Sequence, residues 1–283
     1  MKVLEQKLKE NYESLTGGQK KVAKIIFENP NLIAFITAEV IGEQVGVSES
    51  TVIRLAQKLG LRGYSELQEM IRKEIKSGRT LTQYQEIRNI SKGKSFVEEL
   101  MQEDMNNIQR AKELLEEQKI YDAVKLMSDA SRIIITGGLA SYGLAYFMAH
   151  WMDTVFRNTE LLDRDGKNYY TQLSKVDADT LVIAIIFPRY KQDTLEFIRY
   201  AKKKGARVLA ITDSDLSPVY PYADLVLATP VNTKINIDSY TAPLSIITAL
   251  MRYVSTLNSD RVETNLKEIE SVYQECNVFY QDK

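Results

Sequence analysis

The sequence predicts an α + α/β protein, in which an all-helical N-terminal domain precedes a doubly wound, five-stranded parallel sheet. The 283 residues are enough for two ordinary domains, and 44% apolar with 27% charged residues is typical of a globular protein. Residues 1–77 contain no strand-like run. From Ser131 onward, short apolar runs alternate with amphipathic stretches, which is the pattern of strands connected by helices.

Helix starts are marked clearly in the first domain. Thr16-x-x-Gln19 and Ser65-x-x-Gln68 both match the capping box, in which two side chains satisfy the first amides of a helix. Apolar residues at helical spacing follow each box, and the first of these helices is expected to stop before Pro30. We therefore assign residues 1–77 to a helical domain.

A polar stretch without a clear period follows, SGRTLTQYQEIRNISKGK, and we assign residues 78–94 to a linker. The second domain is expected to span residues 95–283. Ser95-x-x-Glu98 is a third capping box and opens a charged helix to about Glu117, and a second helix is expected from Tyr121 to Ala130.

Five apolar runs are predicted to be the strands of the sheet. Most are nearly continuous in Val, Ile and Leu, as expected for strands that are covered on both faces. The stretches 140–156, 168–174 and 190–204 can hold crossover helices, and two more helices are expected at about 240–257 and 260–280. The runs are RIIITG, TELLD, TLVIAIIF, RVLAIT and DLVLAT.

The stretch ITAEVIGEQVGVSESTVIRLAQKLGLRGYSEL predicts a helix, a tight turn and a second helix. Gly42 allows a close helix crossing, and Gly46 allows the left-handed backbone of the turn. Ser48 can cap the second helix, whose N-terminal side chains then face outward, where a recognition helix meets base edges and phosphates. A plain helical hairpin is the alternative. The predicted DNA contacts are Ser48, Glu49, Ser50, Thr51, Arg54, Lys58 and Arg62.

The segment from LTGGQKKVAKIIFENP through ITAEVIGEQVGVSESTVIRLAQKLGLRGYSELQ resembles the N-terminal domain of the RpiR (MurR/RpiR) family of bacterial transcription regulators, over about residues 12–76. The resemblance implies that the second domain is a SIS domain, a flavodoxin-like sheet that binds sugar phosphates, over about residues 120–255. It also implies that the loop from Thr212 to Pro218 matches the family's T-D-S-x-x-S-P motif beside the ligand.

Two departures from the family pattern affect this ligand site. Leu139 stands where the G-x-G-x-S loop has its second glycine, and residues 186–191 (IFPRYK) replace the hydroxyl-rich S-x-S-G-x-T loop. In a doubly wound sheet, ligands bind beyond the C-terminal ends of the strands. Arg189 and Lys191 could therefore grip an anion with side-chain cations, with Tyr190 stacking or donating its hydroxyl; the alternative is a solvated loop or a dimer contact.

The predicted effector site combines these cations with the positions that match the family and with a glycine turn at the first helix start, which is expected to offer free amides to an anion. Its residues are Gly137, Ser141, Arg189, Tyr190, Lys191, Thr194, Thr212 and Ser214.

The amino-acid composition limits which kinds of site and which cellular location we expect. One cysteine, Cys276, excludes an internal disulfide, and no apolar run approaches the roughly 20 residues of a membrane span, so we expect a cytoplasmic protein. His150 is the single histidine and is expected to be a packed helix position, which leaves no His/Cys metal spacing and no predicted cofactor or metal. Residues 1–80 carry a net charge of +3 (13 Lys or Arg against 10 Glu), a weak indication of nucleic acid.

The sequence thus favours a sequence-specific, DNA-binding transcription regulator, without enzyme activity, that responds to a phosphosugar or a similar anionic metabolite. Its expected partners are a double-stranded operator, a small anionic effector and further copies of the chain, as a homodimer or tetramer, because paired recognition helices multiply specificity. One alternative is a regulator whose SIS domain has lost ligand binding and only dimerises. The other is a sugar-phosphate isomerase, for which Asp238 and His150 are the candidate bases.

Overall fold

The computed structural model divides the chain into two compact units, and each is described by itself. The structure describes residues 2–28, 33, 36–72, 95–162, 169–215, 217–231, 233 and 238–280. The predicted linker, residues 78–94, lies outside this part of the chain, so the domain bounds stay a prediction.

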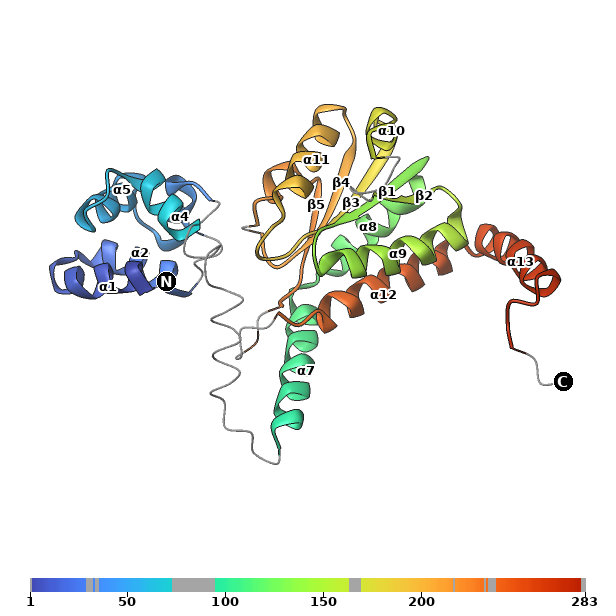
Figure 1. Ribbon diagram of the computed structural model, residues 1–283, viewed down its shortest axis with the longest axis horizontal. Coiled ribbons are helices and arrows are strands. Elements are labelled where there is room, and N and C mark those ends of the chain that lie inside the picture. Colours follow the sequence, from blue (N-terminus) through green and yellow to red (C-terminus); the bar gives the residue numbers. More distant parts are fainter. Residues whose placement is uncertain are drawn as a thin grey trace. The chain divides into compact units, whose positions relative to one another are not determined.

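In the described residues of the N-terminal unit, all the regular secondary structure is helical (Figure 1). One apolar core unites its helices, in which Leu4, Val22, Ile41, Leu55 and Leu67 are fully buried. Residues 64–72 are also helical. The named elements are α1 (Lys2–Asn11), η1 (Tyr12–Ser14), α2 (Gly17–Glu28), α4 (Ala38–Val45) and α5 (Glu49–Lys58).

The first predicted capping box forms, and the other two do not. The Thr16 amide donates to Gln19 Oε1 at 3.0 Å, and the Gln19 amide donates to Thr16 Oγ1 at 3.3 Å. Ser65 instead lies inside a helix that has already begun at residue 64, and Gln68 Nε2 donates to the carbonyls of residues 33 and 36. Ser95 makes no capping bond and its hydroxyl donates to Glu99, not Glu98.

The second unit contains the predicted five-stranded sheet, with every strand parallel to its neighbours. The strand order β2-β1-β3-β4-β5 is that of a doubly wound, flavodoxin-like sheet, in which the direction of winding reverses between β1 and β3. All six residues of β3 are buried, because this strand is central and covered on both faces. The strands are β1 (Arg132–Gly137), β2 (Thr159–Leu161), β3 (Thr180–Ile185), β4 (Arg207–Thr212) and β5 (Leu225–Ala228).

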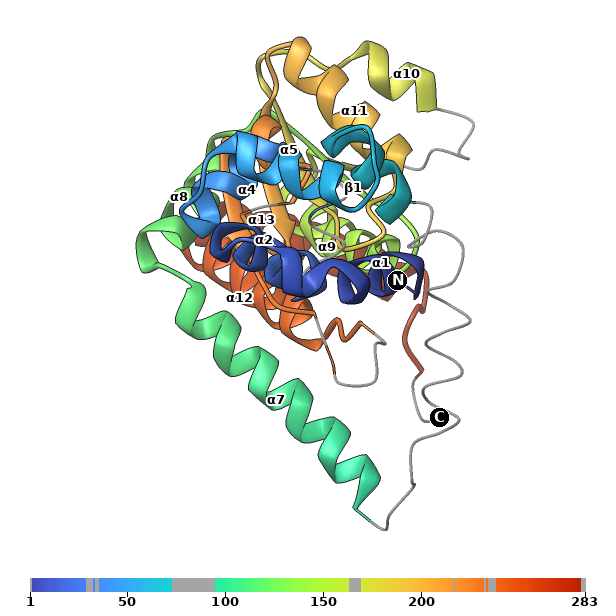
Figure 2. The ribbon, with the colours of Figure 1, turned by 90° about the vertical axis from the view of Figure 1, so that its left-hand side faces the viewer.

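Helices cover both faces of the sheet, and alternate strand residues supply the two cores. Ile133, Ile183 and Leu209 belong to the core that also contains the buried residues of α8, α9 and α12. In Figures 1 and 2, α10 and α11 lie on the opposite side of the sheet. The helices of this unit are α7 (Phe96–Leu114), α8 (Glu117–Asp129), α9 (Ser141–Phe156), α10 (Tyr169–Ser174), α11 (Gln192–Lys203), α12 (Thr241–Leu257) and α13 (Ser259–Glu275), with the short η2 (Tyr220–Tyr222).

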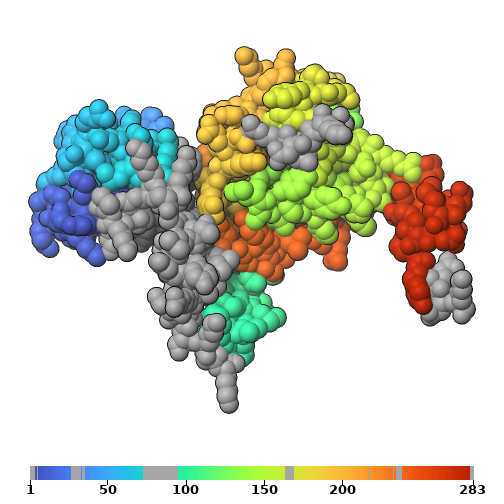
Figure 3. All heavy atoms as spheres, in the orientation of Figure 1, coloured from blue at the N-terminus to red at the C-terminus, as the bar shows by residue number. Residues whose placement is uncertain are grey.

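The last helix, α13, extends beyond the end of α9 and is drawn in red in Figure 3. Polar contacts hold it there, because Asn265 Nδ2 donates to the carbonyl of Val155 at 2.7 Å and Arg261 to that of Phe156 at 2.6 Å. None of the helices in the described part of the chain combines the length and apolar character that crossing a bilayer requires.

Candidate functional sites

The first candidate site is the helix-turn-helix formed by α4 and α5. Gly46 has φ +70°, so the turn uses the left-handed backbone that favours glycine. A Cβ atom added to Gly42 would lie 2.6 Å from the carbonyl oxygen of Val47, so only glycine permits this approach of α4 to the turn. The close crossing and the tight turn predicted from these two glycines are therefore both present.

The second helix, α5, divides into an inner and an outer face. Val52, Leu55 and Ala56 are buried. Most of the predicted DNA contacts are exposed, and Thr51 is partly buried. Ser48 occupies the N-cap position, but its hydroxyl contacts the hydroxyls of Ser50 and Thr51, at 2.9 and 3.0 Å, rather than a backbone amide. The start of α5 therefore carries three linked hydroxyls.

The two basic residues at the end of this segment already have partners within the unit. Lys58 donates to the carbonyl of Ser14. Arg62 forms an ion pair with Glu66 at 3.2 Å, and that carboxylate also accepts the Arg62 amide at 2.7 Å. These bonds lower the pKa of Glu66 below its ordinary value. Both cations are exposed, and their roles in DNA binding stay predictions.

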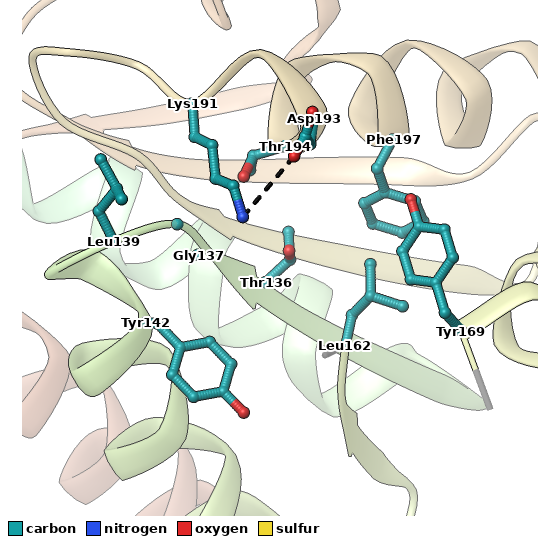
Figure 4. A pocket seen from close by; sticks show the side chains of 11 residues that line it. Thr136, Gly137, Leu139, Tyr142, Leu162, Tyr169, Lys191, Asp193, Thr194 and Phe197 are labelled. Carbon is teal, nitrogen blue, oxygen red and sulfur yellow. Dashed lines mark ion pairs between the residues drawn. The ribbon is translucent and has the colours of Figure 1, made fainter. Parts of the chain in front are cut away.

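The second candidate site is a pocket of about 320 Å³ at the C-terminal ends of β1 and β3, where the winding of the sheet reverses. In a doubly wound sheet this switch point is the usual place for a ligand. Figure 4 shows Lys191 and Asp193 above the pocket and Tyr142 below it. The lining residues are Thr136, Gly137, Gly138, Leu139, Tyr142, Leu162, Tyr169, Lys191, Asp193, Thr194 and Phe197.

The charged side chains of this pocket, Lys191 and Asp193, lie at the start of α11. Lys191 Nζ lies 3.7 Å from Asp193 Oδ2, and each side chain is 34% exposed (Figure 4). A Cβ atom on Gly138 would lie 2.8 Å from Lys191 Cβ and 3.0 Å from Thr194 Oγ1. The tip of β1 thus approaches α11 closely because residue 138 is glycine, and this approach holds Lys191 against the pocket.

Two hydroxyl side chains, those of Thr136 and Thr194, line the same pocket. Thr136 is 4% exposed and Thr194 is 5% exposed. A hydroxyl group can both donate and accept a hydrogen bond, so this part of the pocket wall suits a polar ligand.

Of the eight predicted effector residues, Gly137, Lys191 and Thr194 line the pocket. Ser141 and Thr212 are buried, and Ser214 is partly buried, but none of the three lines it. Arg189 is exposed and has φ +72°, a left-handed backbone in the loop between β3 and α11. The structure therefore brings fewer than half of these residues together at the pocket.

Tyr190 serves a different purpose from the one its position suggested. It is 5% exposed, and its hydroxyl donates to the carboxylate of Asp213, 2.8 and 2.9 Å from the two oxygens. Burial raises the pKa of Asp213 above its ordinary value, and the charge of Asp238 adds to this, although the bonds from Tyr190 and Thr212 oppose it. Tyr190 thus ties the loop that carries Lys191 to the end of β4.

The start of α9 does not offer the free amides that we expected there. The amides of Ser141, Tyr142 and Gly143 donate to the carbonyls of residues 138, 139 and 140, at 3.1–3.2 Å. Leu139, which replaces a family glycine, has φ +56°, so the loop keeps the left-handed backbone that glycine adopts more easily. The expectation of an open anion nest at this turn was wrong.

Sequence reasoning missed six of the lining side chains: Thr136, Tyr142, Leu162, Tyr169, Asp193 and Phe197. Asp193, Thr194 and Phe197 follow helical spacing, so the strand-end rule applied along the first turns of α11 could have found them. His150 was expected to be packed, but it is exposed on α9 and stacks on Tyr146 at 6.3 Å between ring centroids.

The fold and the two sites define a class of protein in which a DNA-binding helix-turn-helix unit precedes an α/β unit with a switch-point pocket. Residues 1–78 match the helix-turn-helix domain of the rpiR family, and residues 126–252 match the SIS domain. The chain therefore belongs to the rpiR family of transcriptional regulators.

Individual relatives agree with this assignment. A helix-turn-helix-type transcriptional regulator of Thermotoga maritima is 27% identical over 239 residues, which cover 84% of this chain and 85% of the relative. The Vibrio vulnificus NanR protein, solved in complex with ManNAc-6P, has a TM-score of 0.68 and 17% identity over 97% of this chain and 98% of its own. The sugar isomerase domain of an RpiR transcription factor from Sphaerobacter thermophilus has a TM-score of 0.60 and 22% identity, and covers 63% of this chain and 99% of its own.

Proposed function

We propose that this transcriptional regulator binds a small phosphorylated sugar or polyol in its switch-point pocket and that the ligand changes its affinity for DNA. The observation that carries the proposal is that Lys191 and the hydroxyl side chains of Thr136 and Thr194 line one pocket at the switch point of the sheet. A phosphate group accepts hydrogen bonds from all three at once. The ManNAc-6P bound by NanR belongs to the same chemical class.

Thermal unfolding against a panel of sugar phosphates and polyol phosphates tests this proposal. A ligand at 100 times its dissociation constant stabilises the native state by about 2.7 kcal/mol. Lys191→Ala should abolish the shift, whereas Lys203→Ala, an exposed lysine at the other end of α11, should keep it. If no member of the panel stabilises the protein, the sheet unit is better explained as an assembly domain that has lost its ligand.

The DNA-binding role of α5 can be tested separately. DNA fragments selected from a random library by the full-length protein supply the probe. Arg54 is exposed on α5, and Arg54→Ala should reduce discrimination between selected and scrambled DNA by about 1–3 kcal/mol. Lys125→Ala, an exposed change on α8, is the control. Equal discrimination by both variants would refute the role of Arg54.

We further propose that the protein acts without catalysis. Isomerisation requires a base beside the sugar carbons, and neither His150 nor Asp238 lines the pocket. Asp193 is the acidic group there, and it lies beside Lys191. Incubation of the purified protein with aldose and ketose phosphates, followed by analysis of the sugars, would overturn this view if an isomer accumulates at a rate that Asp193→Asn removes.

The protein is proposed to act as a dimer through α9. Tyr146, Phe147 and Trp151 are 58%, 44% and 40% exposed on this helix, an unusual concentration of rings at a surface. By contrast, seven residues of α12 are buried within the sheet unit. Sedimentation of Trp151→Glu should show a smaller species than the unaltered protein, whereas Tyr253→Glu on α12 should not.

A further inference from the structure

The N-terminal unit has a basic helix beside the helix-turn-helix, and the proposed function leaves its purpose open. The sequence of α2 contains Lys20, Lys21 and Lys24, and its single acidic residue is the last one of the helix. By contrast, α4 contains two glutamates and neither lysine nor arginine. Both helices pack against α5. Positive charge beside α5 is therefore concentrated on α2 and not on α4.

The first turn of α2 lies against the start of α5. A Cβ atom added to Gly18 would lie 3.2 Å from Val47 Cγ1 and 3.4 Å from Thr51 Cγ2, so this side of α2 contacts both the turn and the recognition helix. Residues three apart are neighbours on one face of a helix, so Lys21 lies next to Gly18 on this side. Lys21 is exposed. It therefore reaches solvent beside the end of α5 that is expected to face DNA.

Lys21 also differs from several nearby cations in having no bonding partner within the described part of the chain. Lys58 and Arg62, at the far end of the helix-turn-helix segment, both bond to groups of the same unit. Lys20 lies over the ring of Tyr12, with its Nζ atom 4.8 Å from the ring centroid. An external anion can bind Lys21 without displacing an existing contact.

We propose that Lys21 binds the phosphate backbone of the operator next to the bases that α5 reads. Contacts to phosphates fix the orientation of a protein on the duplex, whereas contacts to base edges specify the sequence. The charge of α2 is complementary to the DNA backbone, and its exposed lysine continues the surface formed by the start of α5. This inference rests on the proposed DNA-binding role of α5.

A lysine that is only solvated makes a different prediction. Such a residue contributes to the general charge alone, so removing any other exposed lysine of the unit would change DNA affinity as much. A lysine bound to phosphate releases counterions from the DNA, and its loss reduces the dependence of affinity on salt. Because a phosphate contact reads no sequence, selected and scrambled DNA should be weakened by the same factor.

Fluorescence anisotropy of labelled DNA, titrated with the full-length protein at several salt concentrations, provides the test. The probes are the fragments that the protein selects from a random library and their scrambled counterparts. We expect Lys21→Ala to reduce the slope of log affinity against log salt by about 0.9 for each chain bound. Between about 50 and 200 mM salt, the affinity of this variant then falls about threefold less per chain than that of the unaltered protein.

Two further variants control for charge and for position. Lys21→Arg keeps the charge and should keep the slope. Lys9→Ala makes the same change of charge at an exposed position of α1, in the same unit, and should also keep the slope. If Lys9→Ala reduces the slope as much as Lys21→Ala, general charge explains the effect and the specific contact is refuted.

The remaining outcomes separate this proposal from the proposed function. If Arg54→Ala reduces discrimination while Lys21→Ala keeps the slope, the role of α2 is refuted and that of α5 stands. If Lys21→Ala weakens selected DNA more than scrambled DNA, the lysine contacts bases and the backbone role is again refuted. If the unaltered protein selects no DNA sequence, with or without the sugar phosphates, the proposed function itself fails.

Discussion

The bond between Tyr190 and Asp213 offers a quantitative test of how the pocket loop is held. Tyr190→Phe removes one hydroxyl that is 2.8 Å and 2.9 Å from the two carboxylate oxygens and leaves the packed ring in place. A hydrogen bond to a charged group contributes about 1.5–3 kcal/mol, so we expect a loss of about 2 kcal/mol at a pH above the folded pKa of Asp213, where the carboxylate is ionised. The hydroxyl of Thr212 also donates to this carboxylate, at 3.1 Å.

The same substitution should depend on pH. The pKa of Asp213 is raised in the folded state, so the contribution of this group to stability is fully present below its unfolded pKa and is lost as the pH rises through the folded pKa. Tyr190→Phe removes a bond that favours the carboxylate, so it raises this pKa further. The free energy of unfolding should then fall more steeply as the pH rises. At acidic pH, below the folded pKa of Asp213, the bond joins neutral groups, and the loss should fall to about 1 kcal/mol.

Urea unfolding followed by fluorescence measures both values, because the single tryptophan, Trp151, lies on α9 in the same unit. Tyr170→Phe is the control, since Tyr170 is 80% exposed and should change stability little. A loss below about 0.5 kcal/mol above the folded pKa of Asp213, or an equal loss above and below that pKa, would refute the view that this bond holds a charged carboxylate.

Three further predictions concern other parts of the chain. Gly42→Ala should destabilise the N-terminal unit by about 1–3 kcal/mol, because the added Cβ would lie 2.6 Å from a backbone carbonyl oxygen. Urea unfolding followed by circular dichroism measures this loss. Gly17→Ala is the control, since a Cβ there has open space and should not destabilise the unit. Leu139→Gly should stabilise the ligand-free protein by about 0.5–1 kcal/mol in thermal unfolding, since it relieves a left-handed leucine; a fall in stability would contradict this. Asp104→Ala removes the acceptor of two hydroxyl hydrogen bonds and should lower stability by about 2 kcal/mol. It should also reduce the effect of bound ligand on DNA affinity, while the affinity for the ligand itself is retained. An unchanged effect of ligand on DNA affinity would exclude Asp104 from the response.

The sheet could be predicted almost completely from the sequence because each strand is marked by its own residues. Continuous runs of Val, Ile and Leu mark strands that are covered on both faces, and all five runs form strands. The helix-turn-helix was equally accessible, since Gly42 sits where any side chain would meet a backbone carbonyl and Gly46 has the left-handed backbone that favours glycine. In both cases the residue type itself carries the constraint.

The pocket was harder to predict because its walls come from distant parts of the chain. Leu162 and Phe197 are apolar residues whose positions in the sequence do not distinguish them from ordinary core residues. Tyr190 illustrates the opposite error, because a ring between two cations suggested a ligand contact. Its partner, Asp213, lies 23 residues away on the next strand, and only the fold brings the two together.

Contacts within the sheet unit extend from the pocket loop to α7, the first described helix after the N-terminal unit along the chain. Phe187, at the start of the loop between β3 and α11, meets the ring of Tyr240 edge-on at 5.5 Å between centroids. The hydroxyls on either side of Tyr240, those of Ser239 and Thr241, both donate to Asp104 of α7, at 2.5 and 3.0 Å.

These contacts give a physical basis for a response to ligand, but contiguity alone does not produce one. A ligand shifts α7 only if it binds two arrangements of the loop with different affinities, and the coupling must then be reciprocal, so that DNA changes ligand affinity by the same factor. The loop that carries Lys191 is anchored at one end by Tyr190 and contacts Tyr240 at the other. Binding at Lys191 therefore acts on a segment whose position both the sheet and α7 constrain, which is the arrangement that reciprocal coupling requires.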